Sequence, residues 1–220
     1  MLGYLQNLIQ ALDFSSFLSA LLRVAAVLLC LTVHESCHGL AAYVMGDPTA
    51  KSMRRISMNP LRHIDWFGLA MMFFAGFGWA KAVPVDPRYF KKPKEGMAVT
   101  ALAGPISNFI LAVLAIGGAK VIYLYAGYST GMEILFNFLL YTVTPLSIGL
   151  GLFNLLPIPP LDGSKILAVL LPNRIYFQLL RYERYGMLLL LVLSYFGLTG
   201  SLISGSIQSV YMALVKLFFY

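Results

Sequence analysis

The sequence is poor in charged residues. Asp, Glu, Lys and Arg make up 11% of its 220 residues, whereas a soluble domain usually carries about 25%. Apolar residues make up 59%, and the mean hydropathy is +0.78. This composition excludes an ordinary soluble domain and places the chain in the membrane class.

Acidic residues and cysteines are scarce. Nine Asp and Glu face sixteen Lys and Arg, which gives a net charge of +7. The basic surplus lies in short loops between apolar runs, so membrane topology explains it better than nucleic-acid binding. The two cysteines, Cys30 and Cys37, lie too far apart on one expected helix to form a disulfide. The first residues lack the features of a cleaved signal peptide, so we expect the first span to direct insertion.

Long apolar runs are abundant, and a membrane span needs about 20 mostly apolar residues. We therefore expect an all-α polytopic membrane protein with about five transmembrane helices. The expected spans are residues 17–45, 97–125, 134–156 and 187–203, with a weaker one at 207–220.

Residues 47–80 fit no simple span. Residues 51–65 alternate in polarity and suggest a loop with short strands, and 66–80 is apolar but short. Thirteen of the sixteen basic residues lie in loops 47–65, 81–96 and 165–184, so all three loops should face the cytoplasm. Residues 66–80 then cannot cross the membrane once. We predict a re-entrant or short-strand hairpin around 47–80.

The sequence LTVHESCHGLAAYVMGD, residues 31–47, places ionisable groups in an apolar helix. His34 and His38 are four residues apart, so on a helix they share one face and can bind one metal ion. Glu35 is placed to take a proton from a water bound to that metal. Ionisable groups at membrane depth cost several kcal/mol and are usually functional. The pattern predicts a metal site near the middle of the membrane.

A catalytic zinc needs a third protein ligand and one open position. One candidate, Asp162, follows an apolar span in NLLPIPPLDG, residues 154–163, where prolines interrupt the helix. Irregular backbone is tolerated at membrane depth only beside protein or a water-filled cavity. For Asp162, the role of metal ligand is therefore favoured over the role of cap in a simple proline-rich turn. The other candidates lie in basic loops and are Asp47, His63, Asp65 and Asp86.

Several motifs together resemble the site-2 protease family of intramembrane zinc metalloproteases. They are HESCH on an early span, AGPISN at residues 103–108 and N-x-x-P-x-x-P-x-D-G at 154–163. MNPLRHID at 58–65 and GWAKAVPVDPRYF at 78–90 are similar to the short bacterial members. Ala82 stands where relatives often have proline, which affects only the expected loop geometry.

The resemblance implies His34, His38 and Asp162 as ligands of one zinc ion per chain, and Glu35 as the catalytic acid and base. It also implies that Asn154 positions the substrate carbonyl or its oxyanion. For Asn108, lining the cavity and packing between helices both remain open. We expect a single intramembrane metalloprotease domain over 1–220, with a catalytic core of about 30–165 and no room for the PDZ or CBS domain of other members.

The leading hypothesis is an intramembrane zinc endopeptidase that cleaves transmembrane segments of membrane-anchored proteins. A membrane metal-ion carrier that uses the same three ligands is the alternative, and Glu35 discriminates because carriage needs no general base. A non-proteolytic scaffold is a third possibility, disfavoured by the intact HExxH motif. We expect a multi-pass protein in the plasma membrane of a prokaryotic cell, with the active site towards the cytoplasmic side. Its expected partners are the lipid bilayer and a membrane-anchored protein substrate, and no nucleic acid.

Overall fold

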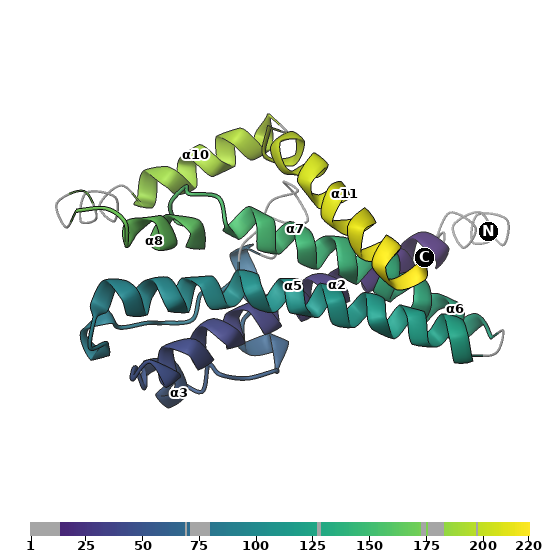
Figure 1. The fold of residues 1–220 in the computed structure, drawn as a ribbon, viewed down its shortest axis with the longest axis horizontal. Helices are drawn as coiled ribbons and strands as arrows, with labels where there is room; N and C mark the ends of the chain where they lie inside the picture. Colours follow the sequence, from purple (N-terminus) through teal and green to yellow (C-terminus); the bar gives the residue numbers. More distant parts are fainter. Residues whose placement is uncertain are drawn as a thin grey trace, which may run out of the picture.

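The computed structural model describes residues 14–68, 70, 80–126, 129–172, 175, 183–196 and 198–220. These residues form helices and connecting turns and contain no strand (Figure 1). The longer helices are α2 (Phe14–Val44), α5 (Pro93–Tyr125), α6 (Thr130–Asn137), α7 (Thr144–Asn154), α10 (Glu183–Tyr195) and α11 (Leu198–Phe219). The shorter ones are α3 (Thr49–Ser52), η1 (Pro60–Arg62), η2 (Pro87–Tyr89), the π-helical turn η3 (Phe138–Val143) and α8 (Asp162–Ala168).

Three helical segments within the described residues are long and apolar enough to cross a membrane. They are Phe17–Val44, Pro93–Tyr125 and Thr130–Asn154, the last built from α6, η3 and α7 in succession. At about 1.5 Å per residue, even the shortest of them exceeds the 30 Å thickness of a bilayer core. The first three predicted spans are therefore confirmed as helices of sufficient length, and an all-helical membrane protein is confirmed as the class.

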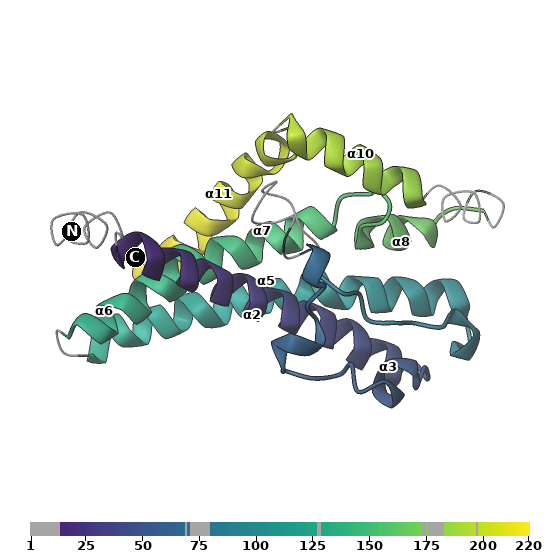
Figure 2. The ribbon, with the colours of Figure 1, turned by 180° about the vertical axis from the view of Figure 1, so that it is seen from behind.

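The predicted single span over 187–203 is wrong. One helix, α10, ends at Tyr195, and a second, α11, begins at Leu198. The two helices meet at a sharp angle (Figures 1 and 2). Apolar composition was uniform across this region and therefore did not reveal the break, although the sequence contains Gly197, a residue type common where helices end. A count of about five spans thus remains unsupported.

The short strands predicted within 51–65 are also absent. The amides of Ser52 and Met53 bond to the carbonyls of Pro48 and Thr49, which forms the turn of α3. Asn59 then caps η1 by accepting the Leu61 amide at 3.0 Å. Local helical turns satisfy these backbone groups in place of a strand ladder. Residues 69 and 71–79 of the predicted hairpin lie outside the described residues.

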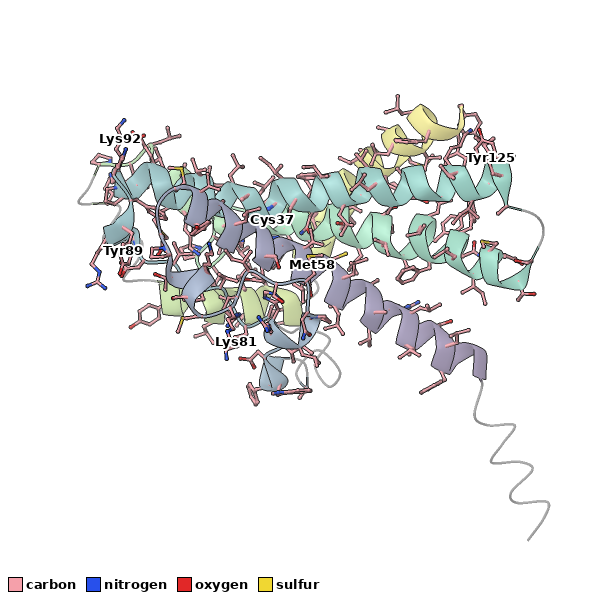
Figure 3. All side chains as sticks on the ribbon, turned by 90° about the horizontal axis from the view of Figure 1, so that it is seen from below. Cys37, Met58, Lys81, Tyr89, Lys92 and Tyr125 are labelled. Carbon is pink, nitrogen blue, oxygen red and sulfur yellow. The ribbon has the colours of Figure 1, made fainter. Side chains whose placement is uncertain are left out.

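Helix α5 is the centre of the fold and packs against α2, α7, α8 and α11. Lys92, just before α5, and Tyr125, its last residue, lie at opposite ends of the molecule (Figure 3). The end near Lys92 also carries α3 and α8 (Figures 1 and 2). Small side chains line the contact of α5 with α2 and η3, where Ala26, Cys30, Ala115 and Val143 form a buried cluster. This close packing brings the HESCH turn of α2 against α5.

Candidate metal centre

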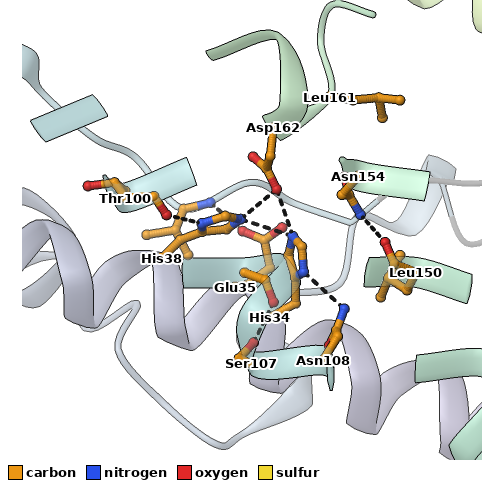
Figure 4. A network of polar contacts seen from close by, with 12 residues as sticks. His34, Glu35, His38, Thr100, Ser107, Asn108, Leu150, Asn154, Leu161 and Asp162 are labelled. Atoms are coloured by element: carbon orange, nitrogen blue, oxygen red, sulfur yellow. Dashed lines mark hydrogen bonds and ion pairs between the residues drawn. The ribbon is translucent and has the colours of Figure 1, made fainter. Parts of the chain in front are cut away.

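Two helices far apart in sequence bring three potential ligands together. His34 and His38 project from successive turns of α2, and Asp162 projects from the first residue of α8 (Figure 4). The two Nε2 atoms lie 2.9 Å apart, and Asp162 Oδ2 lies 3.2 Å from Nε2 of His34 and 3.1 Å from Nε2 of His38. All three residues are buried. They form a metal-ligand group with no more than 4.8 Å between any two ligand atoms.

Helix α5 holds the opposite nitrogen of each imidazole. His38 Nδ1 donates to the backbone carbonyl of Thr100 at 2.7 Å. His34 Nδ1 lies 3.1 Å from the side-chain amide of the fully buried Asn108. With this amide turned so that its oxygen accepts the Nδ1–H, Oδ1 gains the partner that it otherwise lacks. Both Nε2 atoms are then free to bind a metal, as in known histidine sites.

Gly104 allows α5 to approach the histidines this closely. A Cβ atom at this position would lie 2.6 Å from His34 Cε1 and closer still to the ring of His38. Any other residue would therefore displace the imidazoles or α5. The glycine of the AGPISN motif is explained by this contact, which the sequence alone did not reveal.

The irregular segment after α7 places Asp162. Leu161 has an extended backbone and precedes α8, and Ser164 Oγ donates to the Leu161 carbonyl at 2.7 Å. A Cβ atom on Gly163 would overlap the carbonyls of Leu155 and Leu156, so the segment folds back tightly on the end of α7. The D-G pair thus combines a ligand with the only residue type that fits this bend.

The donor set fits zinc. Tetrahedral coordination at about 2.0–2.1 Å separates ligand atoms by roughly 3.3 Å, close to the distances between the three ligand atoms here. Asp162 Oδ2 is buried and, apart from the two Nε2 atoms, has no hydrogen-bond partner among the described residues, as expected of an atom that binds a metal with them. Two imidazoles and one carboxylate are the ligands of many catalytic zinc sites, which leave one position for water or substrate. The fold and this site define a metallohydrolase embedded in apolar helices.

The ligands face a cavity of about 590 Å³. Glu35 and Asn154 also line it, together with Thr100, Val83, Lys165 and Leu190. Glu35 is buried, and one of its carboxylate oxygens accepts the Val83 amide at 2.8 Å. Asn154 donates one side-chain N–H to the Leu150 carbonyl at 3.0 Å, and its other N–H has no partner among the described residues (Figure 4). Both predicted catalytic residues therefore share the cavity with the three ligands.

The four other ligand candidates lie apart from the metal-ligand group. Asp47 accepts the Thr49 and Asp86 amides at 2.9 and 2.7 Å, and Asp65 accepts the Gly68 amide at 2.9 Å. Hydrogen bonds from Arg88 lower the pKa of Asp86 and hold its carboxylate.

His63, the remaining candidate, is buried and bonds the Ser57 carbonyl at 2.8 Å. Its ring is thus hydrogen-bonded within its own loop and lies outside the metal-ligand group.

Sequence reasoning missed Thr100, Gly104 and Val83, and left Asn108 undecided. Thr100 and Val83 act through backbone atoms, so their side chains give no signal. Gly104 and Asn108 belong to a motif whose presence was noted, but its contact with the histidines depends on how α5 packs on α2.

Comparison with known proteins identifies the family of this chain. Peptidase family M50 matches residues 119–194, which include Asp162. A Bacillus subtilis protein named "Putative zinc metalloprotease YwhC" is 39% identical over 175 residues, covering 77% of this chain and 78% of its own. A Mycolicibacterium smegmatis protein named "Putative zinc metalloprotease Rip2" is 28% identical over 180 residues, covering 79% of this chain and 66% of its own.

An archaeal relative is similar over a shorter region. "Zinc metalloprotease MJ0392" of Methanocaldococcus jannaschii is 31% identical over 133 residues, covering 59% of this chain and 34% of its own. No solved structure gives a significant match. The chain belongs to Peptidase family M50, the site-2 protease family that its motifs resemble. It is a zinc metalloprotease with Zn²⁺ as its cofactor.

Proposed function

We propose that the protein is an intramembrane endopeptidase that cleaves transmembrane segments of membrane-anchored proteins. The observation that carries this proposal is a buried His-His-Asp group whose two histidines, with Glu35 beside them, lie on a helix long enough to span a membrane. Cleavage of soluble peptides does not require metal ligands on a membrane-spanning helix. Cleavage of a substrate within the bilayer does require them at that depth.

In this proposal His34, His38 and Asp162 hold the zinc ion. When bound, zinc supplies Lewis acidity, which polarises a substrate carbonyl and makes water a stronger acid. The bonds from Thr100 and Asn108 keep the imidazoles oriented throughout the reaction.

Glu35 is the general base and general acid. It takes the proton of the attacking water and returns it to the leaving amine as the peptide bond breaks. The unused N–H of Asn154 stabilises negative charge on the carbonyl oxygen. The substrate helix must unwind locally at this point, because a peptide bond within a helix is shielded and hydrogen-bonded.

We further propose that the chain is one domain of about five spans, in the plasma membrane of a prokaryotic cell. The basic segments at 51–55 and 81–92 support a cytoplasmic position for the end of the molecule that carries α3 and α8. Arg55 Nη2 bonds the Lys81 carbonyl at 2.5 Å, so these two segments lie together. Residues 66–80 would then enter and leave on one side, as a re-entrant hairpin does. The active site would face the cytoplasm.

The metal-carrier alternative is not favoured. A carrier needs the three ligands but has no use for a carboxylate beside them, and the relatives are named metalloproteases. Glu35 therefore provides the test.

We expect Glu35→Gln to abolish cleavage while zinc remains bound. The amide has nearly the same size but cannot take the proton of water, and general acid–base catalysis contributes roughly 10²–10⁴-fold. The measurement is cleavage of a synthetic single-span peptide reconstituted in vesicles with the protein, alongside zinc analysis of the same samples.

Glu95→Gln is the matched control, because Glu95 is exposed, pairs with Lys92 at 3.0 Å and lies outside the metal-ligand group. It should cleave at the parental rate. Parental cleavage by Glu35→Gln would refute the hydrolytic mechanism. Loss of zinc from that variant would instead make Glu35 a ligand.

A further inference from the structure

The segment 81–86, KAVPVD, lies against the HESCH turn of α2 in an irregular, extended conformation. Pro84 cannot donate a hydrogen bond and disfavours helix at the residue before it, so the segment remains extended. Several of its backbone groups, at Lys81, Ala82, Val83 and Asp86, are bonded to residues from other parts of the chain. These bonds determine where the segment lies relative to Glu35.

The beginning of the segment is held by the loop before it. The Lys81 amide donates to the His63 carbonyl at 2.9 Å. Arg55 Nη2 donates to the carbonyls of Lys81 and Ala82 at 2.5 and 3.3 Å. Lys81 lies beside the loops that flank α2 (Figure 3).

The end of the segment is held by Asp47. This carboxylate is fully buried, and its Oδ2 accepts the Asp86 amide at 2.7 Å. Its Oδ1 accepts the amide of Thr49, so Asp47 links the end of α2 to the segment. These bonds explain how the carboxylate of Asp47 can be fully buried.

Between these anchors, the Val83 amide donates to Glu35 Oε2 at 2.8 Å. This bond is buried and joins residues 48 positions apart in the sequence. The Val83 side chain fits against Gly39, one turn after Glu35, since a Cβ atom there would lie 3.3 Å from Val83 Cγ1. Glu35 and Gly39, one turn apart on α2, thus both contact Val83.

We propose that the main-chain N–H of Val83 is a positioning group for the catalytic base. This inference rests on the proposed function. By holding Oε2, the N–H leaves Oε1 of Glu35 as the oxygen that takes the proton of water. It also keeps the carboxylate from turning towards the zinc ligands. The segment 81–86 acts as a rigid support, and Asp47 and Arg55 hold its two ends.

Residue-resolved hydrogen exchange of the zinc-loaded full chain in detergent tests the bond itself. We expect Glu35→Ala to speed exchange of the Val83 amide by roughly tenfold or more, because its acceptor is lost. Glu35→Gln keeps a carbonyl acceptor and should preserve most of the protection. The Asp86 amide is the internal control, since it should respond to Asp47→Ala and not to Glu35→Ala.

Two outcomes overturn the inference. One is unchanged exchange at Val83 in Glu35→Ala. The other is equal acceleration at Lys81, Val83 and Asp86, which would indicate general loosening.

Kinetics test the consequence for catalysis. Val83→Pro removes the N–H, and Val83→Ala retains it while shortening the side chain. We expect kcat of the proline variant to be roughly 10–100-fold below that of the alanine variant, with the same KM and zinc content. Equal kcat values would overturn the positioning role.

If the parent does not cleave the single-span peptide, the proposed function fails. In that case, and also if Val83→Pro does not fold, hydrogen exchange still tests whether the Val83 amide is bonded to Glu35.

Discussion

At the scale of single residues, the contacts of each proposed ligand leave one of its atoms available to bind a metal. Both imidazoles have Nδ1 engaged by α5, and within the described residues the buried Asp162 Oδ2 meets no hydrogen-bonding group except their Nε2 atoms. An unpartnered buried carboxylate oxygen is costly unless a cation binds it. Two predictions follow from this arrangement.

Asp162→Ala should reduce bound zinc from about one ion per chain to near zero, because two histidines alone hold zinc weakly. Metal analysis of dialysed protein is the measurement. Asp65→Ala is the control, since Asp65 lies outside the ligand group and should leave zinc unchanged. Full zinc content in Asp162→Ala would show that another residue is the third ligand.

Gly104→Ala should also lose zinc and activity, since the added methyl group would overlap the ring of His38 and press on His34. We expect at least a tenfold weaker affinity for zinc, by analogy with changes around other metal ligands. Gly205→Ala is the matched control, as a Cβ atom there meets nothing within 4 Å. Equal zinc affinities in the two variants would contradict the proposed contact.

At the scale of elements, the central question is how α2 and α5 sit in the membrane. Helices α2 and α5 pack along their length, and their connection carries basic residues on both sides of 66–80. The bond from Arg55 to the Lys81 carbonyl holds these two basic segments together, which supports the proposal that both lie on one face of the membrane.

Single cysteines at Lys51 and Lys91, in a variant without Cys30 and Cys37, should therefore react with an impermeant reagent from the same side. A cysteine at Gly131, at the start of α6, should react only from the opposite side. Labelling in sealed vesicles and in opened vesicles makes the comparison. Opposite accessibility of the first two positions would refute the re-entrant hairpin and reverse the later spans.

At the scale of the whole molecule, the proposed zinc ligands come from α2 and α8, which both pack against α5. A ligand that binds only the folded state stabilises it, by about 2.7 kcal/mol at a free concentration of one hundred times Kd. We therefore expect zinc to contribute to stability as well as to chemistry.

Chelation should lower Tm by roughly 5–10 °C in a chain of this size, and added zinc should restore it. Thermal unfolding in detergent measures this shift. Asp162→Ala should melt at the same temperature with and without chelator. If the Tm of the parent protein does not change on chelation, zinc does not connect α2 and α8.

Local patterns in the sequence were enough to predict three long apolar helices and the common face of His34 and His38. Both follow from helical geometry within one segment, where residues four apart must be neighbours. Asp162 was predicted because prolines interrupt an apolar run there. The same local reasoning was wrong about strands in 51–65 and about one span over 187–203, where turn hydrogen bonds and a helix break prevailed.

Only the tertiary structure decided what surrounds the ligands. Thr100, Gly104 and Asn108 meet the histidines because α5 packs on α2, and Val83 meets Glu35 because Asp47 and Arg55 hold its segment. These contacts join residues 39–74 positions apart in several cases. Many sequences satisfy the local helical pattern, but a backbone donor or a missing Cβ acquires its role only when packing places it within about 3 Å of its partner.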